Sequence, residues 1–421
     1  MSERFVIRGG RPLRGDVQVS GSKNASLYTL AAALLTADPV TIRNVPEIAD
    51  IGEMADVCRS LGADVEVDGT TVHLQAREFT STAPPMDRVM ALRASFLVMG
   101  PLLAREGEAA CASPGGDVIG VRPLDVHLAG FRALGAEVHR EGTDWTARSA
   151  RLQGARIFLD YPSVLGTVNV MFAAALAEGT TTIVNAAAEP EVAMAADLLN
   201  AMGAKVRGQG TAQMEIEGVQ RMHGTDFEVV PDRIETGTYL LASAATGGDV
   251  RVTNAQPGEL DSLLTKFREM GANLEVSLDG GGVRVAAPRK LQPIQVQAVP
   301  YPGFPTDLHA PMAVALTQAD GVSTIHERVF DNRTAYVGEL LTLGAKIITG
   351  GQTVIIEGGT PLIGAAVRAL DIRAGASVVI AGLVADGETQ VRGVDHLDRG
   401  YAHLTERLTD LGADVERRFV N

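Results

Sequence analysis

The sequence is poor in aromatic residues and in cysteine. Phe, Trp and Tyr make up only 4% of its 421 residues, so we expect cores built from Ala, Val, Leu and Ile. The two cysteines, Cys58 and Cys111, offer neither a disulfide framework nor the spacing of a metal site. Cys58 fits the apolar face of the segment ADVCRSLGA and is expected in a core, whereas Cys111 lies in EAACAS, an apolar run typical of a strand.

Long hydrophobic runs are also missing. No apolar stretch reaches the length that spans a membrane, and the first residues, MSERFVIRGG, lack the apolar core of a signal peptide. We therefore expect a soluble, cytoplasmic protein with no membrane insertion. No P-loop or metal-binding motif is present, and the GQG at 208–210 lacks the rest of a dinucleotide-binding fingerprint.

Positive charge is in deficit. Lys and Arg total 37 against 51 Asp and Glu, which leaves a net charge of −14. This balance argues against nucleic acid or an anionic membrane surface as a general partner. A small anionic ligand then requires a local cluster of arginines that overrides the overall field. The length suggests two or three domains, and the sequence does not define an oligomeric state.

One short phrase recurs six times, from SLGADV at 60–65 to DLGADV at 410–415. Each of the last three copies follows its counterpart among the first three by 209 residues. Three units were therefore copied as a block, which predicts two homologous halves. The glycines of the phrase are Gly62, Gly135, Gly203, Gly271, Gly344 and Gly412.

Each unit predicts the same order of elements. A strand with a polar end leads to a helix, the repeated Gly takes the left-handed position after that helix, and another strand follows. Before them lies a nearly all-apolar helix, such as NVMFAAALAEG at 169–179, and a helix with so little polar surface is buried on all sides. We therefore predict an α/β protein of two inside-out barrel domains, with three repeats in each and a ligand-binding cleft between them.

Cations recur at the predicted N-termini of helices, where backbone N–H groups favour anions. A single Arg there is more simply a solvated surface charge, but several at one end of the repeats suit a phosphate or carboxylate ligand. Arg122 and Arg399 each precede their repeat glycine by 13 residues and so occupy equivalent loops. The polar residues at such positions are Lys23, Asn24, Arg93, Arg122, Arg333, Asp371, Arg373 and Arg399.

Two aspartates are candidates for proton transfer. Asp307, in YPGFPTDLHAP, fits a helix N-cap as well as a general base that accepts a proton from a substrate hydroxyl. Asp117, in SPGGDVIGVRP, fits ordinary turn chemistry as well as a proton donor five residues before Arg122. We expect His127 and His309 to be structural.

Seven segments carry a resemblance to one family: GGRPLRGDVQVSGSKNASL, SPGGDVIGVRPLDVH, NAAAEPEV, PDRIETGTYL, NAQPGELD, FPTDLHAP and HLDRGY. Over essentially its whole length the sequence resembles the UDP-N-acetylglucosamine 1-carboxyvinyltransferases, the enolpyruvyl transferases that begin peptidoglycan synthesis. The resemblance implies the inside-out barrel in duplicate. Residues 22–229 would form a first domain that carries a mobile loop at about 111–122, and residues 1–21 plus 230–421 a second domain that carries Asp307.

The resemblance also implies a reaction between two small-molecule substrates. The enolpyruvyl group of phosphoenolpyruvate would pass to the 3′-hydroxyl of UDP-N-acetylglucosamine through a tetrahedral ketal, with release of phosphate and no metal or organic cofactor. Asp307 would take the hydroxyl proton and Asp117 would act as general acid. Phosphoenolpyruvate and the departing phosphate would be bound by Lys23, Arg93, Arg122 and Arg399. The sugar nucleotide and cleft closure would involve Asn24, Arg122, Pro123, Leu124, Asp125, Ser163, Val164, Val329, Arg333, Asp371 and Arg373.

The sequence departs from the family at two places. The family usually carries Cys where Asp117 stands, and fosfomycin alkylates that Cys, so the resemblance implies insensitivity to this antibiotic. Cys111 is not expected to replace the missing thiol. Tyr161 stands where the family usually has Lys or Phe, and 165–166 is Leu-Gly where the family usually has Gly-Ala. Two alternatives are therefore an enolpyruvyl transferase for another nucleotide acceptor, and a catalytically silent paralogue that binds the nucleotide sugar.

Overall fold

The computed structural model describes residues 2–115, 119–120, 123–277, 282–288 and 290–420, which form two compact units. The N-unit comprises residues 21–115 and 123–230, and the C-unit comprises residues 2–20, 119–120 and the described residues from 231 onward. Residues 119–120 belong to the C-unit because the backbone N–H of Asn332 donates to the carbonyl oxygen of Ile119 at 3.1 Å. The expectation that the whole loop at 111–122 belongs to the first domain therefore does not hold for these two residues.

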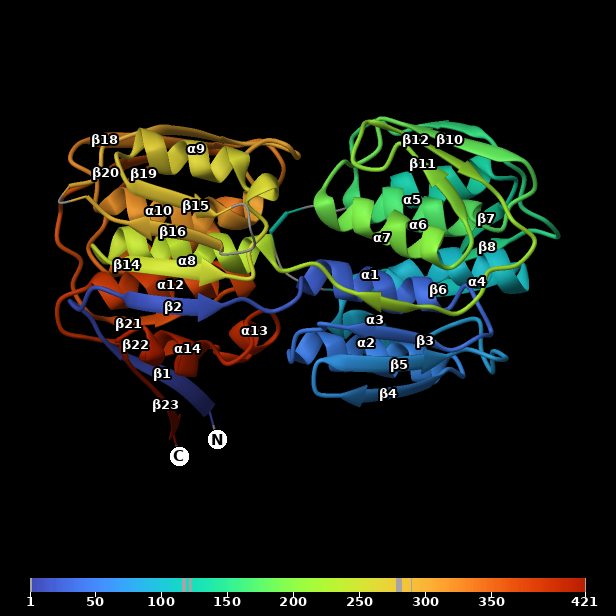
Figure 1. Cartoon of the computed structure of the whole chain (residues 1–421), viewed down its shortest axis with the longest axis horizontal. Coiled ribbons are helices and arrows are strands. Elements are labelled where there is room, and N and C mark those ends of the chain that lie inside the picture. Colours follow the sequence, from blue (N-terminus) through green and yellow to red (C-terminus); the bar gives the residue numbers. More distant parts are fainter. Residues whose placement is uncertain (1, 116–118, 121–122, 278–281, 289, 421) are drawn as a thin grey trace. The chain divides into compact units, whose positions relative to one another are not determined.

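Three four-stranded sheets surround the inner helices of the C-unit (Figure 1). In each sheet one edge strand pairs parallel with its neighbour, and the other pairs are antiparallel. The first sheet is β2 (Arg14–Gln18), β14 (Asp249–Thr253), β16 (Gly282–Ala286) and β15 (Asn273–Ser277). The second is β17 (Gln295–Ala298), β18 (Val322–Glu327), β20 (Thr353–Glu357) and β19 (Lys346–Gly350). The third is β21 (Ala366–Arg368), β22 (Glu388–Arg392), β1 (Ser2–Arg8) and β23 (Asp414–Val420).

The N-unit repeats this plan with two four-stranded sheets and one of three strands. The first sheet is β13 (Asp226–Glu228), β3 (Val40–Arg43), β5 (Thr71–Gln75) and β4 (Asp64–Asp68). The second is β6 (Glu108–Ala112), β8 (Asp144–Arg148) and β7 (Glu137–Glu141). The third is β9 (Arg156–Phe158), β10 (Thr180–Val184), β12 (Gln213–Glu217) and β11 (Lys205–Arg207).

The start of the chain completes sheets that are built mainly from its second half. Strand β1 lies between β22 and β23, with Phe5 opposite both Val391 and Arg417. Strand β2 pairs parallel with β14. Because these strands hydrogen-bond to residues hundreds of positions away, the C-unit cannot complete its sheets without residues 2–20.

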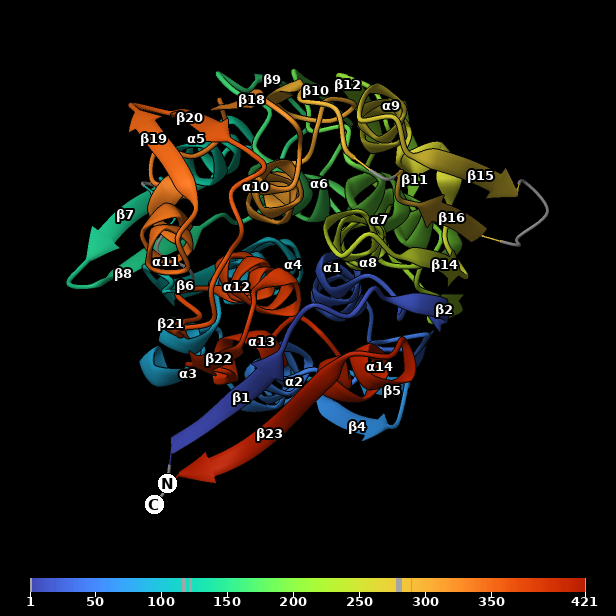
Figure 2. The same ribbon diagram turned by 90° about the vertical axis from the view of Figure 1, so that its left-hand side faces the viewer.

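The inner helices are buried on nearly all sides. Every residue of α8 and α10 is buried, and Figure 2 views α8, α10 and α12 almost end-on inside their sheets. No helix among the described residues is both long and apolar enough to cross a membrane. The inner helices are α1 (Lys23–Ala33), α4 (Met99–Glu106), α6 (Val164–Ala174), α8 (Arg233–Ala245), α10 (His309–Thr317) and α12 (Ile372–Val384).

An amphipathic helix precedes each repeated glycine. These helices are α2 (Ala49–Ser60), α5 (Asp125–Ala133), α7 (Pro190–Ala201), α9 (Asp261–Glu269), α11 (Val337–Thr342) and α14 (Leu404–Asp410). All six repeat glycines have positive φ, between 78° and 105°, which confirms the predicted left-handed position. The remaining helices are α3 (Met86–Ala91), α13 (Asp395–Asp398) and the 3₁₀ helices η1 (Arg93–Val98), η2 (Pro257–Glu259), η3 (Thr306–Leu308) and η4 (Arg333–Tyr336).

Two of the expected apolar helices start as 3₁₀ turns. Helix α4 is preceded directly by η1, and α10 directly by η3. Pro101 and Pro311 are each the third residue of the α-helix that follows. Proline is tolerated only in the first turn of an α-helix, because in later turns its ring clashes with the carbonyl of the residue four positions earlier. The α-helical part therefore begins just before each proline.

We predict that the cost of replacing the repeat glycine Gly135 comes from backbone conformation alone. Gly135 has φ +90°, and a Cβ added there meets no atom within 4 Å. Gly135→Ala should lower the free energy of unfolding by about 1–2 kcal/mol, the cost of a left-handed alanine, and Gly135→Asn by less. Urea unfolding measures both.

The matched control is Gly52→Ala, in helix α2 of the same unit. A Cβ on Gly52 also meets nothing within 4 Å, and its φ is not positive. This change should be neutral or stabilising by up to about 1 kcal/mol. Equal effects of Gly135→Ala and Gly52→Ala would contradict the backbone explanation.

Candidate active site

In the C-unit, the Asp307 carboxylate lies between two buried guanidinium groups. Nη2 of Arg333 donates to Oδ1 of Asp307 at 2.9 Å, and Nε of Arg373 donates to Oδ2 at 3.1 Å. The side chains of both arginines are at most 6% exposed, whereas that of Asp307 is 26% exposed. Two cations favour the ionised form of a carboxylate. Asp307 is therefore a fixed carboxylate that keeps access to solvent, and it is not the cap of α10.

Arg373 owes its position to the N-terminus of α12. Asp371 is the N-cap of this helix, and its Oδ1 accepts hydrogen bonds from the N–H groups of Arg373 and Ala374 at 2.7 and 2.9 Å. The guanidinium of Arg373 lies over the ring of Tyr401, 5.4 Å from its centroid. The Tyr401 hydroxyl is 3.0 Å from Oγ1 of Thr238. Cap, ring and carboxylate together fix one orientation of the Arg373 side chain.

Glu327 connects the segments that carry Asp307 and Val329. It is fully buried at the end of β18. Its Oε2 accepts a hydrogen bond from Oγ1 of Thr306 at 2.9 Å, and its Oε1 accepts from the N–H of Val329 at 2.7 Å. Burial raises the pKa of Glu327, an effect that these hydrogen bonds and Arg333 oppose.

In the N-unit, Lys23 is the first residue of α1, directly after the Ser22 N-cap. Its Nζ lies 2.7 Å from Oδ2 of Asp50, in the first turn of α2, and the two side chains are 9% and 2% exposed. Asn24 follows on α1 and is partly exposed. A buried ammonium requires a carboxylate partner of this kind.

Arg93 opens η1 and lies near a buried histidine. Burial lowers the pKa of His127 to about 3, and the charge of Arg93 contributes to this shift. Nδ1 of His127 is 3.0 Å from Nδ2 of Asn169, which also donates to the carbonyl oxygen of Phe96 at 2.9 Å. Burial and the charge of Arg93 thus favour the neutral imidazole, and the contact of Nδ1 with Asn169 holds the ring within the core, in keeping with the structural role expected for His127.

Of the predicted sugar-nucleotide residues of the N-unit, Pro123, Leu124, Asp125, Ser163 and Val164 lie at the starts of α5 and α6. Ser163 is the N-cap of α6, with Val164 as its first residue, and the Ser163 hydroxyl accepts from the N–H of Gly166 at 3.2 Å. The hydroxyl of Tyr161 donates to Oδ1 of Asp125 at 3.3 Å. Burial, and then the charge of Asp125, raise the pKa of Tyr161. Pro123 and Leu124 directly precede α5.

Three further candidate residues are Arg399, Asp117 and Arg122. Arg399 follows the four-residue helix α13 as its C-cap, so it does not lie at a helix N-terminus as expected. Asp117 and Arg122 lie outside the described residues.

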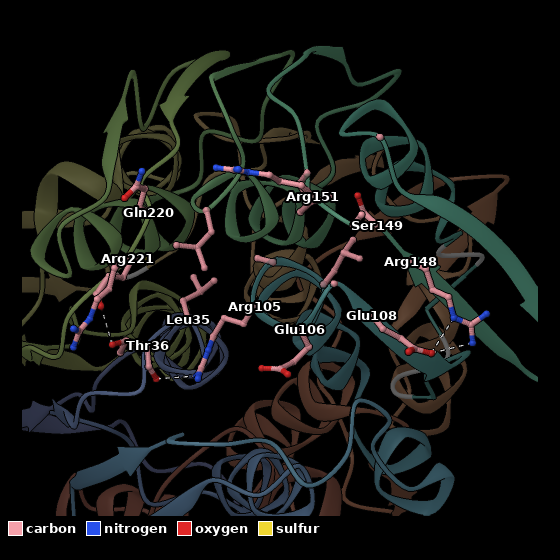
Figure 3. Close-up of a pocket in the computed structure, with 18 of the residues that line it drawn as sticks. Leu35, Thr36, Arg105, Glu106, Glu108, Arg148, Ser149, Arg151, Gln220 and Arg221 are labelled. Carbon is pink, nitrogen blue, oxygen red and sulfur yellow. Dashed lines mark hydrogen bonds and ion pairs between the residues drawn. The ribbon is translucent and has the colours of Figure 1, made fainter.

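A hollow of about 1220 Å³ lies at the opposite end of the inner helices of the N-unit (Figure 3). It is lined by the C-terminal ends of α1, α4 and α6, including Leu35, Glu106 and Leu176. Arg105 donates from Nη1 to three backbone carbonyl oxygens there, at 2.8–3.1 Å. Lys23 is at the other end of the 11-residue α1, roughly 16 Å away at 1.5 Å per residue. The hollow is therefore separate from the candidate active site.

Neither cysteine is suited to chemistry. Both are buried free thiols, and burial raises the pKa of Cys58 to about 12 and that of Cys111 further. Cys111 is paired in the sheet opposite Trp145. Among the described residues, no group of three His, Cys, Asp or Glu side chains is placed to hold a metal ion.

Comparison with known proteins gives matches over the whole chain. The family model described as EPSP synthase (3-phosphoshikimate 1-carboxyvinyltransferase) matches residues 7–408. A UDP-N-acetylglucosamine 1-carboxyvinyltransferase 2 of Carboxydothermus hydrogenoformans is 48% identical over 415 residues, 99% of each chain. A UDP-N-acetylglucosamine 1-carboxyvinyltransferase of Desulfosudis oleivorans is 45% identical over 415 residues, again 99% of each chain.

Solved structures agree with these sequence matches. The crystal structure of the enolpyruvyl transferase NikO from Streptomyces tendae has a TM-score of 0.89 at 26% identity and covers 100% of both chains. An EPSP synthase from Acinetobacter baumannii shares the fold, with a TM-score of 0.74 at 18% identity and full coverage of both chains.

The fold and the family model define an enolpyruvyl transferase of the EPSP synthase fold. Within this class, the identity of 45–48% over nearly full length shows that the chain belongs to the UDP-N-acetylglucosamine 1-carboxyvinyltransferase family. The α/β fold class and the family predicted from the seven segments are both confirmed.

Two residues that contact candidate site residues, Asp50 and Glu327, and one buried cation at an equivalent helix start, Arg233, were not found from the sequence. Arg233, the buried first residue of α8, follows the Asp232 cap as Lys23 follows Ser22, so comparison of the repeats would have found it. Glu327 ends the segment TIHE, where other repeats read TIRN, TIVN and RVTN, and this contrast is also visible in the sequence. No sequence signal links Asp50 to Lys23.

We predict that the Asp50 charge is needed chiefly because Lys23 is buried beside it. Asp50→Asn should lower the free energy of unfolding by about 3 kcal/mol, since it removes the carboxylate charge 2.7 Å from a buried ammonium. Adding Lys23→Met should recover part of this loss. Urea unfolding of the two single variants and the double variant measures the coupling.

Asp38→Asn provides the control in the same unit. Asp38 pairs with Arg221 on the surface at 3.0 Å, and loss of such a pair should cost less than about 1 kcal/mol. If the double variant loses as much free energy of unfolding as the two single variants together, Lys23 and Asp50 do not depend on each other.

Proposed function

We propose that the chain transfers the enolpyruvyl group of phosphoenolpyruvate to the 3′-hydroxyl of UDP-N-acetylglucosamine and releases phosphate. The proposal rests above all on Asp307, whose carboxylate is held between Arg333 and Arg373 in a chain of this family. A proton acceptor must be ionised and aimed in one direction. The two guanidiniums supply both conditions.

The reaction divides into an addition and an elimination. In the addition, the 3′-oxygen bonds to C2 of phosphoenolpyruvate, its proton passes to Asp307, and C3 receives a proton from Asp117. In the elimination, the bond from C2 to the phosphate oxygen breaks, C3 loses a proton and the double bond forms again. The net change replaces phosphate by the sugar oxygen on C2, so no electrons are gained or lost.

Four cations would bind the anionic groups. We assign phosphoenolpyruvate and the departing phosphate to Lys23, Arg93, Arg122 and Arg399. Lys23 is supported by its place at the start of α1, where the helix dipole adds to its charge. Exclusion of water around these cations would strengthen each contact with phosphate.

The sugar nucleotide is assigned to residues of both units. Asn24, residues 122–125, Ser163 and Val164 would contact it from the N-unit, and Val329, Arg333, Asp371 and Arg373 from the C-unit. The contact between Tyr161 and Asp125 favours a second candidate, in which the acceptor is a different nucleotide sugar. Because Asp125 already accepts a hydrogen bond from Tyr161, its carboxylate has fewer acceptor positions left for a ligand.

We predict phosphate release that requires both phosphoenolpyruvate and UDP-N-acetylglucosamine. Asp307→Asn should lower kcat about 10²–10⁴-fold, the usual contribution of a general base, while calorimetry should still detect binding of UDP-N-acetylglucosamine. Asp320→Asn is the control, since the Asp320 side chain is exposed and pairs with Lys290 at the surface, at 2.9 Å.

The same assay over several UDP-sugars separates the alternatives. Faster phosphate release with another UDP-sugar would establish the second candidate. Binding of the sugar nucleotide without any phosphate release would overturn the enzyme and leave the silent paralogue. Full activity of Asp307→Asn would remove Asp307 from the proton transfer.

We predict that Asp117 acts as the general acid. We also predict that the chain is insensitive to fosfomycin, because Asp117 stands in place of the Cys that fosfomycin alkylates. Asp117→Cys should gain fosfomycin sensitivity and shift the pH optimum upward, because a free carboxyl has a pKa of about 3.9 and a thiol about 8.5. Cys111→Ala should leave kcat unchanged, since that thiol is buried. An unchanged pH–rate profile of Asp117→Cys would exclude Asp117 as the acid, and loss of activity in folded Cys111→Ala would transfer the role to Cys111.

A further inference from the structure

Glu327 has an unusual number of hydrogen bonds to loop backbone for a fully buried carboxylate. Oε1 accepts from the N–H groups of Val329 and Phe330 at 2.7 and 3.3 Å. Oε2 accepts from the hydroxyl of Thr306 at 2.9 Å. Nδ1 of His309 is 3.6 Å from Oε2. A buried carboxylate with this many partners is costly to replace and fixes every group that it contacts.

The contacts of Glu327 lead directly to Asp307. Thr306, the residue before Asp307, uses its carbonyl oxygen to accept a hydrogen bond from Nε of Arg333 at 3.1 Å. Arg333 in turn donates from Nη2 to Oδ1 of Asp307. Glu327, Thr306, Arg333 and Asp307 therefore form one continuous chain of hydrogen bonds. The orientation of the Asp307 carboxylate depends on where Glu327 holds Thr306.

Comparison of the repeats shows what this strand position does elsewhere. Asn44, Asn185 and Asn254 each stand two residues after a buried core residue of their strand, as Glu327 stands two residues after Ile325. Each Asn has φ between 57° and 60°. Its amide donates to the carbonyl oxygen just beyond the parallel edge strand, at 2.8–3.4 Å.

Glu327 does not make this contact. It remains in the extended conformation of β18, and its longer side chain reaches Thr306 and the turn at Val329 instead. The Asn joins two strands of one sheet, whereas Glu327 joins the 3₁₀ helix η3 to the turn at Val329, and both carry candidate site residues. The replacement is therefore unnecessary for the barrel, which three other repeats build with Asn.

We propose that Glu327 is a positioning residue for the reaction. Through Thr306 and Arg333 it aims the Asp307 carboxylate, and through its other oxygen it sets the backbone at Val329. This inference rests on the proposed function, in which Asp307 accepts the proton and Val329 contacts the sugar nucleotide. It assigns the two oxygens of Glu327 to two separable effects, one on kcat and one on the KM of the sugar nucleotide.

The test compares variants that remove both contacts or one. Glu327→Ala should lower kcat about 10–100-fold, the cost of a misplaced catalytic group, and should raise the KM of UDP-N-acetylglucosamine. Glu327→Gln should restore most of both values, because an amide can still accept from Val329 and donate to the Thr306 hydroxyl. Thr306→Val should lower kcat alone, and Thr306→Ser should restore it.

His326→Ala is the matched control. His326 is the neighbouring residue on β18, and its ring contacts Oγ1 of Thr353 instead of the Glu327 partners. It should keep the wild-type kcat and KM even where its melting temperature falls. A second readout is independent of turnover: exchange of the Val329 and Phe330 amide hydrogens should accelerate in Glu327→Ala but not in Glu327→Gln.

The outcomes separate this inference from the proposed function. Wild-type kcat and KM in Glu327→Ala, with Asp307→Asn inactive, would overturn the inference and leave the function intact. Equal changes of kcat and KM in Glu327→Gln, Glu327→Ala and His326→Ala would also overturn the inference, since equal changes would reflect a loss of folded protein. If the wild-type chain releases no phosphate, the proposed function is wrong. Unchanged exchange of the Val329 and Phe330 amide hydrogens in Glu327→Ala would overturn the positioning role, whether or not phosphate is released.

Discussion

The burial of the inner helices on nearly all sides is the constraint on which the rest of the structure depends. Because every residue of α8 and α10 is buried, polar and charged groups can concentrate only at the helix ends. The unpaired N–H groups of a buried first turn need acceptors, and cap side chains provide them at the starts of α1, α6, α8 and α12. At the opposite end, Arg105 donates to three carbonyl oxygens beyond the ends of α1 and β5. The N-unit therefore has an apolar interior and polar groups at both ends of its inner helices.

The candidate site follows from the same constraint. A helix N-terminus carries partial positive charge, and the chain places cationic side chains near such ends. These side chains are buried, so an isolated charge there would be unfavourable. Lys23 is neutralised by Asp50, and Arg333 and Arg373 share Asp307. The carboxylates that make these cations tolerable are thus fixed in position by them. The same ion pairs therefore neutralise buried charge and fix the orientation of the carboxylates.

Local signals predicted much of the fold, and non-local contacts account for what was missed. The repeat glycines and apolar helices could be recognised because a left-handed turn and an all-apolar helix are properties of a few consecutive residues. The break of an expected helix at Pro101 was equally local and could have been read from the sequence. The pairing of Asp50 with Lys23 depends on how two helices pack, and no spacing in the sequence encodes it. The resemblance to the family named Asp307, but only the fold shows that Arg333 and Arg373 both hold it.

The two halves use one scaffold with different charge at equivalent caps. Ser22 and Ser163 cap inner helices of the N-unit, and Asp232 and Asp371 cap their counterparts in the C-unit. A neutral cap satisfies the N–H groups without cancelling the helix dipole, so the N-unit suits an anion beside Lys23. An anionic cap offsets the dipole, and in the C-unit the buried guanidiniums of Arg333 and Arg373 also pair with the carboxylate of Asp307. The duplicated fold therefore keeps the same kind of helix start in both units and changes the charge of its cap.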